Sequence, residues 1–517
     1  MSNGRTLLKR FDKAKKRRNG TLWSHLQECY AYAAPQRETF YDYAEGAKRN
    51  TDLSDDTAVI AVQTFANRVQ KALTPAWQDW TQLVVGTNTD PDAQIEFEGE
   101  TISIKSALEK VNERVFEYVH RSNFASRAYE AIIDLSISTG TMTCEFDVAA
   151  DRLIFNSIPL PQLYLESGIH GTIAGHWREH EVEGELIERM WPQAKIPPKT
   201  AEKIAKDPTA KIQLVEGCIY VDKTNVYYVI LAEERHIIFE QDEGETSPFY
   251  SFRGMVVAGE IYGRGQVMQV LPSIKVLNQI KEDELITSGF ASSGAWTGVS
   301  DSIFNPYTVQ IAPGVIIPVM SNKNDNPTIK QIPMDFNVQY THLVADNLIS
   351  NINKALFAEP LGNTDDPTKT ATEVQLRAQM DLERAGSFFS RLTIEFVEQT
   401  MKRVHHVLKR EGKIPKLEID GREVKLKHSS PITLIGNRED VQGLVGAAQT
   451  ISMFGEQAMM NAFKPEAVVP YINDKLGIPT SLTNSKEEIE QLIKAQQEQQ
   501  QAMMAMQMQQ EQAKAEG

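Results

Sequence analysis

The sequence predicts an α+β fold in which helical segments surround a region of short, mostly antiparallel strands. Three observations lead to this prediction. Apolar residues show helical spacing up to about residue 140, short β-prone runs fill 141–257, and long helical patterns return between 262 and 415. At 517 residues the chain is too long for one compact core, so we expect two to four packed regions. A hydrophobic content of 41% with 24% charged residues is ordinary for a globular protein.

The N-terminal part is expected to be mainly helical. The segments with helical spacing of apolar residues are 1–40, 55–75, 102–119 and 126–139. The first is expected to break at Asn19-Gly20, and Gly140 is expected to end the last one.

Two features of this part have both a structural and a ligand-binding interpretation. Pro75, Trp77 and Trp80 form a corner that we interpret as a packing anchor, with a ligand platform as the alternative. A basic cluster over residues 9–18 is interpreted as a solvated helix face, with a nucleic-acid patch as the alternative.

Residues 141–257 change to a strand-like pattern and are expected to form a mostly antiparallel sheet region. Turn signals such as Asp222-Lys223-Thr224-Asn225 separate the β-prone runs. The predicted strands are Met142 to Phe146, Leu153 to Ile158, Ile212 to Val221, Val226 to Leu231, His236 to Glu240 and Phe249 to Val257.

The stretch from Tyr262 to Pro415 is the most organised part of the sequence. A long helical stripe is followed by a small β-containing module, a second helix, a polar loop and a long third helix. Thr370 and Glu373 have the spacing of a capping box at the start of the third helix, and Gly412 is expected to end it. In order, the five parts cover about 267–286, 295–334, 337–357, 360–369 and 370–409.

The C-terminal part is expected to hold two or three helices between Asp440 and Leu476 and a final helix from Ser485. The last helix runs into a Gln/Met-rich tract, Gln496 to Gln512, whose composition suits a solvent-exposed or self-associating helix.

The formal net charge of −15 bears on nucleic-acid binding. Tight binders usually present a basic surface, because their affinity comes largely from neutralising phosphates. The charge therefore counts against a tight DNA binder and is compatible with a conduit whose walls repel DNA.

Neither a disulfide framework nor a membrane span is expected. Cys29, Cys144 and Cys218 lie far apart without paired spacing, which suits a reducing cytosol. No apolar run approaches the roughly 18 to 20 residues that cross a bilayer. The basic N-terminus is not followed by an apolar stretch, so a secretory signal is not expected either.

The search for catalytic motifs finds none, and we predict that the protein is not an enzyme and needs no cofactor. Gly263-Arg264-Gly265 begins a dinucleotide fingerprint, but Met268 stands where the third glycine belongs. No phosphate-binding P-loop and no recognisable serine or cysteine nucleophile motif occurs. His176 and His180 could share one helix face and bind a metal, although Trp177 and Val182 equally fit a structural role in a sheet.

The order of helix, small β-module, helix, polar loop and long helix resembles the stem, clip, stem, tunnel loop and wing helix of phage portal proteins. Short runs narrow the resemblance to the head-to-tail connectors of T7-like podoviruses. These runs are Leu73-Thr74-Pro75 with Trp80, Tyr262-Gly263-Arg264, Thr370-Ala371-Thr372-Glu373-Val374, Ile414-Pro415 and the Gln/Met-rich tail. The resemblance covers the chain from about Leu22 to the tail. It is weakest over 165–250, and it rests on the order and spacing of motifs that are individually weak.

The resemblance implies a portal architecture with long stem helices, a small β-containing clip, a mixed α/β wing with an antiparallel sheet and a helical crown. The implied parts are a wing over 1–261, a first stem helix over 262–294, a clip over 295–335, a second stem helix over 336–359, a tunnel loop over 360–370, the long wing helix with following strands over 371–438, and the crown and tail over 439–517.

The resemblance also implies a role in the virion: a ring of typically twelve subunits at one capsid vertex, assembled in the host cytoplasm. Double-stranded DNA would pass through it, without sequence specificity, during packaging and ejection. Terminase and later tail adaptor proteins would dock on the clip, while capsid and scaffolding proteins would contact the wing. No membrane partner is implied.

The residues expected to meet DNA lie on the tunnel loop and the first stem helix. The tunnel-loop candidates are Gly362, Asn363, Thr364, Thr368 and Lys369. Lys275 and Lys281 are stem candidates, because lysines on a channel-facing helix would be near phosphates. Two alternative functions stay open: a metal-dependent hydrolase that uses His176 and His180, and another virion structural protein such as a tail adaptor or an internal core protein.

Overall fold

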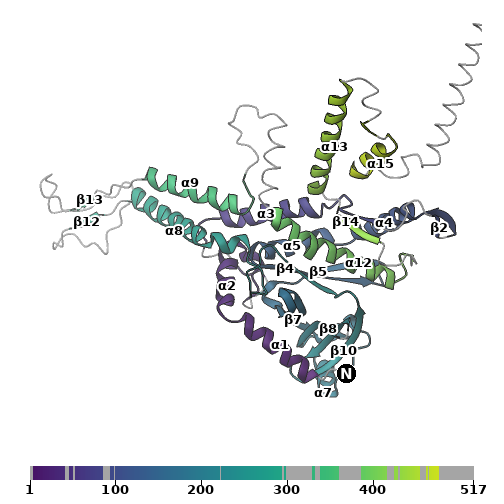
Figure 1. The fold of residues 1–517 in the computed structure, drawn as a ribbon. Helices are drawn as coiled ribbons and strands as arrows, with labels where there is room; N and C mark the ends of the chain where they lie inside the picture. The colour runs from purple at the N-terminus through teal and green to yellow at the C-terminus, as the bar shows by residue number, and fades with distance from the viewer. Residues whose placement is uncertain are drawn as a thin grey trace, which may run out of the picture. The chain divides into compact units, whose positions relative to one another are not determined.

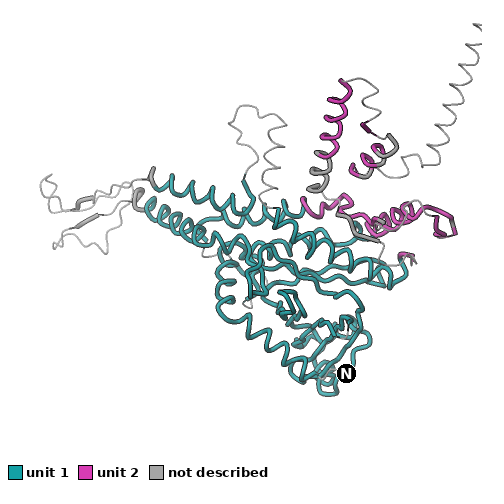
Figure 2. The backbone as a smooth tube through the Cα atoms, viewed as in Figure 1, with its two compact units in different colours: residues 1–71, 118–413 teal, residues 72–117, 414–517 magenta. Residues whose placement is uncertain are grey.

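The computed structural model covers the full chain and divides into two compact units (Figure 2). Unit 1 comprises residues 1–71 and 118–413, and unit 2 comprises 72–117 and 414–517. The structure describes all residues except 1–3, 41–45, 50–52, 86–93, 98, 222, 294–295, 299–328, 332–337, 360–385, 416–423, 429–430, 454–461, 464 and 477–517.

The larger sheet of unit 1 is antiparallel and has five strands in the order β10-β9-β8-β7-β6. Each strand pairs with its neighbour in sequence, so the sheet is a meander. The strands are β6 (Leu163–Ser167), β7 (Ile173–Glu183), β8 (Lys211–Val221), β9 (Thr224–Leu231) and β10 (His236–Gly244). The predicted turn between β8 and β9 is confirmed, with Lys223 in the left-handed region at a φ of 74°.

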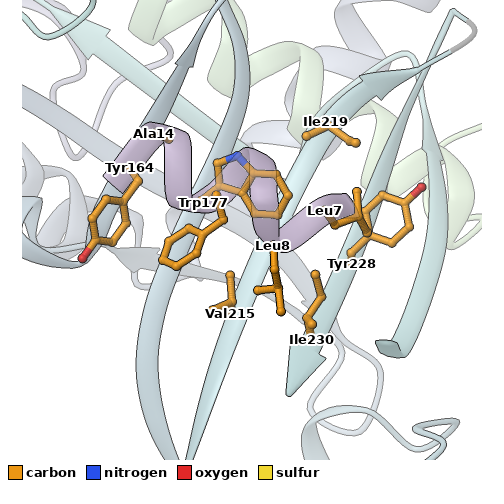
Figure 3. Packing of buried hydrophobic residues seen from close by; sticks show 10 residues of the cluster. Leu7, Leu8, Ala14, Tyr164, Trp177, Val215, Ile219, Tyr228 and Ile230 are labelled. Atoms are coloured by element: carbon orange, nitrogen blue, oxygen red, sulfur yellow. The ribbon is translucent and has the colours of Figure 1, made fainter. Parts of the chain in front are cut away.

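Helix α1 (Gly4–Arg18) covers one face of this sheet and closes a hydrophobic cluster (Figure 3). Its apolar stripe packs on Trp177, which is fully buried. Gly217 on the neighbouring strand makes room for this indole, because a Cβ there would lie 2.3 Å from the Trp177 ring. The other members of the cluster are Leu7, Leu8, Phe11, Ala14, Tyr164, Val215, Ile219, Tyr228 and Ile230.

A second antiparallel sheet has three strands in the order β11-β4-β5, and it packs against two helices that lie far apart in the sequence. Its strands are β4 (Thr139–Asp147), β5 (Arg152–Ser157) and β11 (Phe249–Arg253). Helix α5 (Phe124–Ile137) packs on β4 and β5, and α12 (Gln399–Arg410) packs on β4.

Gly140 does not end a helix, so the expectation for this residue is wrong. Helix α5 stops at Ile137, and Gly140 lies within strand β4. A Cβ at this position would lie 2.5 Å from the Ala131 carbonyl oxygen and 2.5 Å from the Phe252 ring. The glycine is needed for close packing between α5 and β11, which the sequence around it does not reveal.

Unit 1 contains seven further α-helices among its described residues, of which α8 and α9 extend away from the two sheets (Figure 1). The seven helices are α2 (Thr21–Ala33), α3 (Thr57–Leu73, whose last two residues belong to unit 2), α6 (Gly184–Met190), α7 (Pro198–Lys206), α8 (Gln266–Ser293), α9 (Val338–Ala355) and α11 (Gly386–Leu392). A π-helical turn, η4 (Thr393–Glu398), joins α11 to α12. The break between α1 and α2 falls at Asn19-Gly20, as predicted.

Unit 2 contains most of α4 (Ile104–His120), up to Glu117. Strand β1 (Thr81–Val85) pairs with β14 (Val424–His428), and β2 (Gln94–Phe97) pairs with β3 (Glu100–Ser103). Helices α13 (Pro431–Ser452) and α15 (Pro465–Leu476) contact each other.

The tryptophan corner serves as a packing anchor only in part. Trp80 is buried and meets the Phe116 ring edge-on at 5.4 Å, whereas Trp77 is 90% exposed.

The predicted α+β class with antiparallel sheets is confirmed by these elements. Among the described residues, no helix combines the length and the apolar character required to cross a membrane. The predicted final helix from Ser485 lies outside the described residues.

Candidate functional site

Helices α8 and α9 lie side by side and run away from the sheets of unit 1 (Figure 1). At 1.5 Å per residue, the 28 residues of α8 span about 42 Å and the 18 residues of α9 about 27 Å. In the chain between them, β12 (Trp296–Gly298) pairs antiparallel with β13 (Ile329–Gln331). The predicted order of helix, β-containing module and helix is therefore present.

The ends of the pair nearest the sheets belong to the core. On α8, Val267, Leu271 and Leu277 are no more than 5% exposed. On α9, Ile352 is fully buried, as is Leu356 just after the helix ends. These ends are held by the same hydrophobic packing as the rest of unit 1.

The far ends of the same helices keep large apolar side chains in solvent. Leu285 and Ile286 on α8 are 66% and 52% exposed, and Leu343 on α9 is 62% exposed. Nothing in the described part of unit 1 covers them. Where large exposed apolar side chains adjoin one another, they commonly mark a surface that another protein covers.

The start of α8 is fixed by two glycines that lie against the end of α5. A Cβ at Gly265 would lie 2.1 Å from the Ser136 carbonyl oxygen, so only glycine fits there. The Gly265 N–H donates to the Ile137 carbonyl at 2.9 Å, and the Ser138 hydroxyl donates to the Gly263 carbonyl at 2.7 Å. The Gly-Arg-Gly sequence thus serves the close packing of the backbone at the start of α8.

Helix α3 and the residues before it brace both helices of the pair. The buried Asn278 side chain on α8 accepts the backbone N–H groups of Ser54, at 2.8 Å, and of Asp55. Arg68 donates to the carbonyls of Phe357 and Glu359 just beyond the end of α9. Sequence reasoning missed both bracing residues, because the groups that they bind lie more than 200 positions away.

The two lysines predicted to lie on a stem helix are each paired with a glutamate of the same chain. Lys275 lies 2.8 Å from Glu28, whose hydrogen bond raises the pKa of the lysine. Lys281 lies 2.9 Å from Glu284, which also approaches His342 at 3.6 Å. Both lysines remain partly accessible, and their charge is locally balanced.

The tunnel-loop candidates lie outside the described residues, as does the Thr370–Glu373 capping box. The candidates concerned are Gly362, Asn363, Thr364, Thr368 and Lys369.

His176 and His180 lie on strand β7, and the helix face that a shared metal would require is absent. Four residues along a strand separate two side chains by about 13 Å. Burial lowers the pKa of each imidazole to about 4, and His180 faces Glu216 at 3.0 Å. No cluster of three or more His, Cys, Asp or Glu side chains that could hold a metal ion occurs in the described part of the chain.

Two ion pairs hold the described part of the long third helix, one to strand β10 of the larger sheet and one to strand β11 of the small sheet. Arg403 donates to Glu243 at 2.7 Å and to the Cys144 carbonyl at 3.1 Å. Arg253 donates to Glu395 in the π-helical turn at 2.8 Å. Both pairs join residues more than 100 positions apart, so no local sequence signal could have identified them.

Gly412 ends the long helix as predicted, with a φ of 68°. The Lys413 N–H donates to the Leu408 carbonyl at 2.9 Å and the Gly412 N–H to the Lys409 carbonyl at 3.2 Å, which is the Schellman pattern of helix termination.

Comparison with models of known protein families gives a match over most of the chain. A family model described as "Bacteriophage head to tail connecting protein" matches residues 4–483. No curated protein matches the sequence.

Solved structures with chains similar to this one include two from gene transfer agent particles. A chain of the "Virion of native gene transfer agent (GTA) particle" is 11% identical, with a TM-score of 0.39 over 82% of this chain and 89% of that chain. A chain of the "Neck of empty GTA particle computed with C6 symmetry" is 11% identical, with a TM-score of 0.38 over 76% and 87%.

Proposed function

This chain belongs to the bacteriophage head-to-tail connecting protein family, and we propose that it forms the ring-shaped portal through which double-stranded DNA enters and leaves the capsid. Membership of the family makes it a structural protein of the virion with a connector role. The ring, the DNA channel and the docking of terminase and tail adaptor proteins are the proposal.

The unfinished packing of the α8–α9 pair is the observation that supports a ring. The same two helices are buried at one end and expose Leu285, Ile286 and Leu343 at the other. A closed ring supplies each subunit with two neighbours, so these side chains would be covered without leaving an open edge. We propose that α8 and α9 are the stem helices and that β12 and β13 belong to the clip.

The charges on α8 support a channel that lets DNA slide. A lysine without an acidic partner would bind phosphate, whereas Lys275 is paired with Glu28 and Lys281 with Glu284. With a net charge of −15 on the chain, weak and sequence-independent contacts are the expected result. Within this proposal the loop over 360–370, and Lys369 in particular, supplies the remaining contact with DNA.

The proposed partners follow from the proposed ring. Terminase during packaging and tail adaptors afterwards would bind the clip over 295–335, and capsid and scaffolding proteins would bind the wing. We propose twelve subunits, a place at one capsid vertex, assembly in the host cytoplasm, and kinship with the T7-like podovirus connectors.

Negative-stain microscopy of the purified full-length protein tests the central claim. We expect a closed ring with an axial channel about as wide as a DNA duplex. A monomer, or an assembly without a channel, would overturn the proposal and favour a tail adaptor or an internal core protein instead.

The role of the loop is tested separately with Lys369→Ala. We expect defective packaging or poor retention of packaged DNA by the variant, with the ring intact. Unchanged packaging and retention would show that Lys369 is not a DNA contact, and would leave the proposed ring unaffected.

A further inference from the structure

Helix α1 carries an unusual charge for a chain with this net charge. Residues 5–18 contain basic side chains at more than half of their positions and a single acidic one, Asp12. The basic side chains are Arg5, Lys9, Arg10, Lys13, Lys15, Lys16, Arg17 and Arg18. The structure divides them into two groups with different roles.

The first group fastens α1 to the five-stranded sheet. Arg18 is buried and donates to the carbonyls of Leu160, Pro161 and Leu163 at 2.6–3.2 Å. Arg10 pairs with Glu166 at 3.0 Å, and Lys15 pairs with Glu179 at 2.6 Å. These contacts hold the helix in a fixed orientation on the sheet.

The second group faces solvent on the opposite side. Lys9, Lys13 and Lys16 are exposed, and over the described residues the structure gives none of them a carboxylate partner. Their i, i+4, i+7 spacing places them within an arc of about 60° and along roughly 10 Å of helix. Arg5 and Arg17 are also exposed, so the outer face is a basic stripe, which we define as Lys9, Lys13 and Lys16 with these two arginines.

The composition of the stripe identifies the kind of partner. Every exposed residue of α1 is polar or charged: Arg5, Thr6, Lys9, Asp12, Lys13, Lys16 and Arg17. Protein interfaces are built around apolar and aromatic anchors and are depleted in lysine, so an acidic protein finds little to bind here. A phosphate backbone needs only positive charge, and duplex DNA carries one negative charge per roughly 1.7 Å of axis.

We propose that the basic stripe of α1 is a sequence-independent contact surface for the phosphate backbone of double-stranded DNA, separate from the proposed channel. The existence of the stripe is argued from the way α1 packs on the sheet. The choice of duplex DNA as its ligand rests on the proposed function. Three or more phosphate contacts on a helix that cannot turn away would give weak, salt-sensitive binding.

The test compares two triple variants of the full-length protein with a labelled DNA duplex by fluorescence anisotropy at several salt concentrations. Lys9→Ala/Lys13→Ala/Lys16→Ala removes the three lysines of the stripe and leaves Arg5 and Arg17 in place. Lys199→Ala/Lys203→Ala/Lys206→Ala on α7 is the matched control, because those lysines are exposed, have the same spacing and share their helix with Glu202.

We expect the α1 variant to bind duplex roughly tenfold or more weakly at low salt, with a smaller dependence of affinity on salt by about one unit of slope per lysine. The α7 variant should keep most of the affinity. An equal loss in both variants would reduce the effect to net charge and overturn the proposal. So would duplex binding that the α1 substitutions leave unchanged, or a stripe that binds polyglutamate but not duplex.

The same samples viewed by negative-stain microscopy separate this inference from the proposed function. Rings formed by the α1 variant with duplex affinity unchanged would refute the stripe alone. Failure of the unaltered protein to form rings would refute the portal, whatever the anisotropy shows.

Discussion

Helix α1 and the far ends of the α8–α9 pair are both peripheral parts of unit 1, but they differ in whether their apolar side chains are buried. Helix α1 buries Leu7 and Phe11 against the sheet and turns its charges outward. The far ends of α8 and α9 leave Leu285 and Leu343 in solvent. The first region completes its packing within one subunit, and the second does not, so the second is where assembly is expected to add stability.

The largest expected effect comes from placing charges on the uncovered ends. In a Leu285→Asp/Leu343→Asp variant, carboxylates would have to be buried between subunits, so we expect rings to be lost. The free energy of unfolding of the isolated subunit should change by less than about 1 kcal/mol, because both positions are exposed there. Analytical ultracentrifugation and thermal unfolding measure the two quantities.

Val148→Asp is the control for that variant, since Val148 is 73% exposed in the turn between β4 and β5. Rings should survive this substitution. Rings that also persist in the double variant would mean that the far ends are not the contact surface.

The next largest effect is expected on the other side of the comparison, within α1. Phe11→Ala removes a buried ring that packs on Tyr164 and Trp177, and should lower the free energy of unfolding by about 3–5 kcal/mol. Chemical denaturation in the assembly-deficient background avoids interference from ring contacts. Lys13→Ala on the exposed face of the same helix is the control and should change stability by less than about 0.5 kcal/mol. Equal stabilities of the two variants would contradict the packing role of α1.

The stability of the five-stranded sheet under α1 should also respond to acid. Burial lowers the pKa of His180 from 6.5 to about 4. Between these two values the unfolded chain takes up a proton that the folded chain does not, so stability falls as the pH falls. We expect a loss on the order of 1–2 kcal/mol at about pH 5 from this histidine.

His180→Gln should remove that part of the pH dependence while leaving ring formation at neutral pH intact. A variant that is as acid-sensitive as the unaltered protein would show that His180 is already protonated in the folded state.

The smallest effect is expected at Lys275, at the buried end of α8. Its pair with Glu28 is half exposed, and pairs of this kind contribute less than about 1 kcal/mol. Lys275→Met should therefore leave the melting temperature almost unchanged. A large destabilisation would show that the pair braces α8 and does not merely balance charge.

Most elements of secondary structure could be predicted, because their signals are local. The breaks at Asn19-Gly20 and Gly412, the helices α3, α4 and α9, and the strands β8 and β9 follow from spacing within about ten residues. Strand β1 was missed, since it is short and its partner β14 lies more than 300 positions away. Helices α6 and α7 were missed as well.

The candidate site could be predicted only in outline. The sequence indicated the α8–α9 pair and its lysines, but the glutamates that balance those lysines depend on how the chain folds back. The metal alternative rested on a helical spacing for His176 and His180, and pairing with β6 and β8 makes that segment a strand.

The sequence by itself determined where most of the long helices and many of the strands form and that residues 5–18 are strongly basic, because periodicity and charge are properties of neighbouring residues. Only the tertiary structure decided which apolar faces are buried and which basic side chains of α1 are paired with groups of the sheet region. Those outcomes depend on contacts between segments far apart in the chain, such as Arg18 with the Leu160 carbonyl and Trp177 with Gly217. Leu285, by contrast, is left exposed by the described part of unit 1.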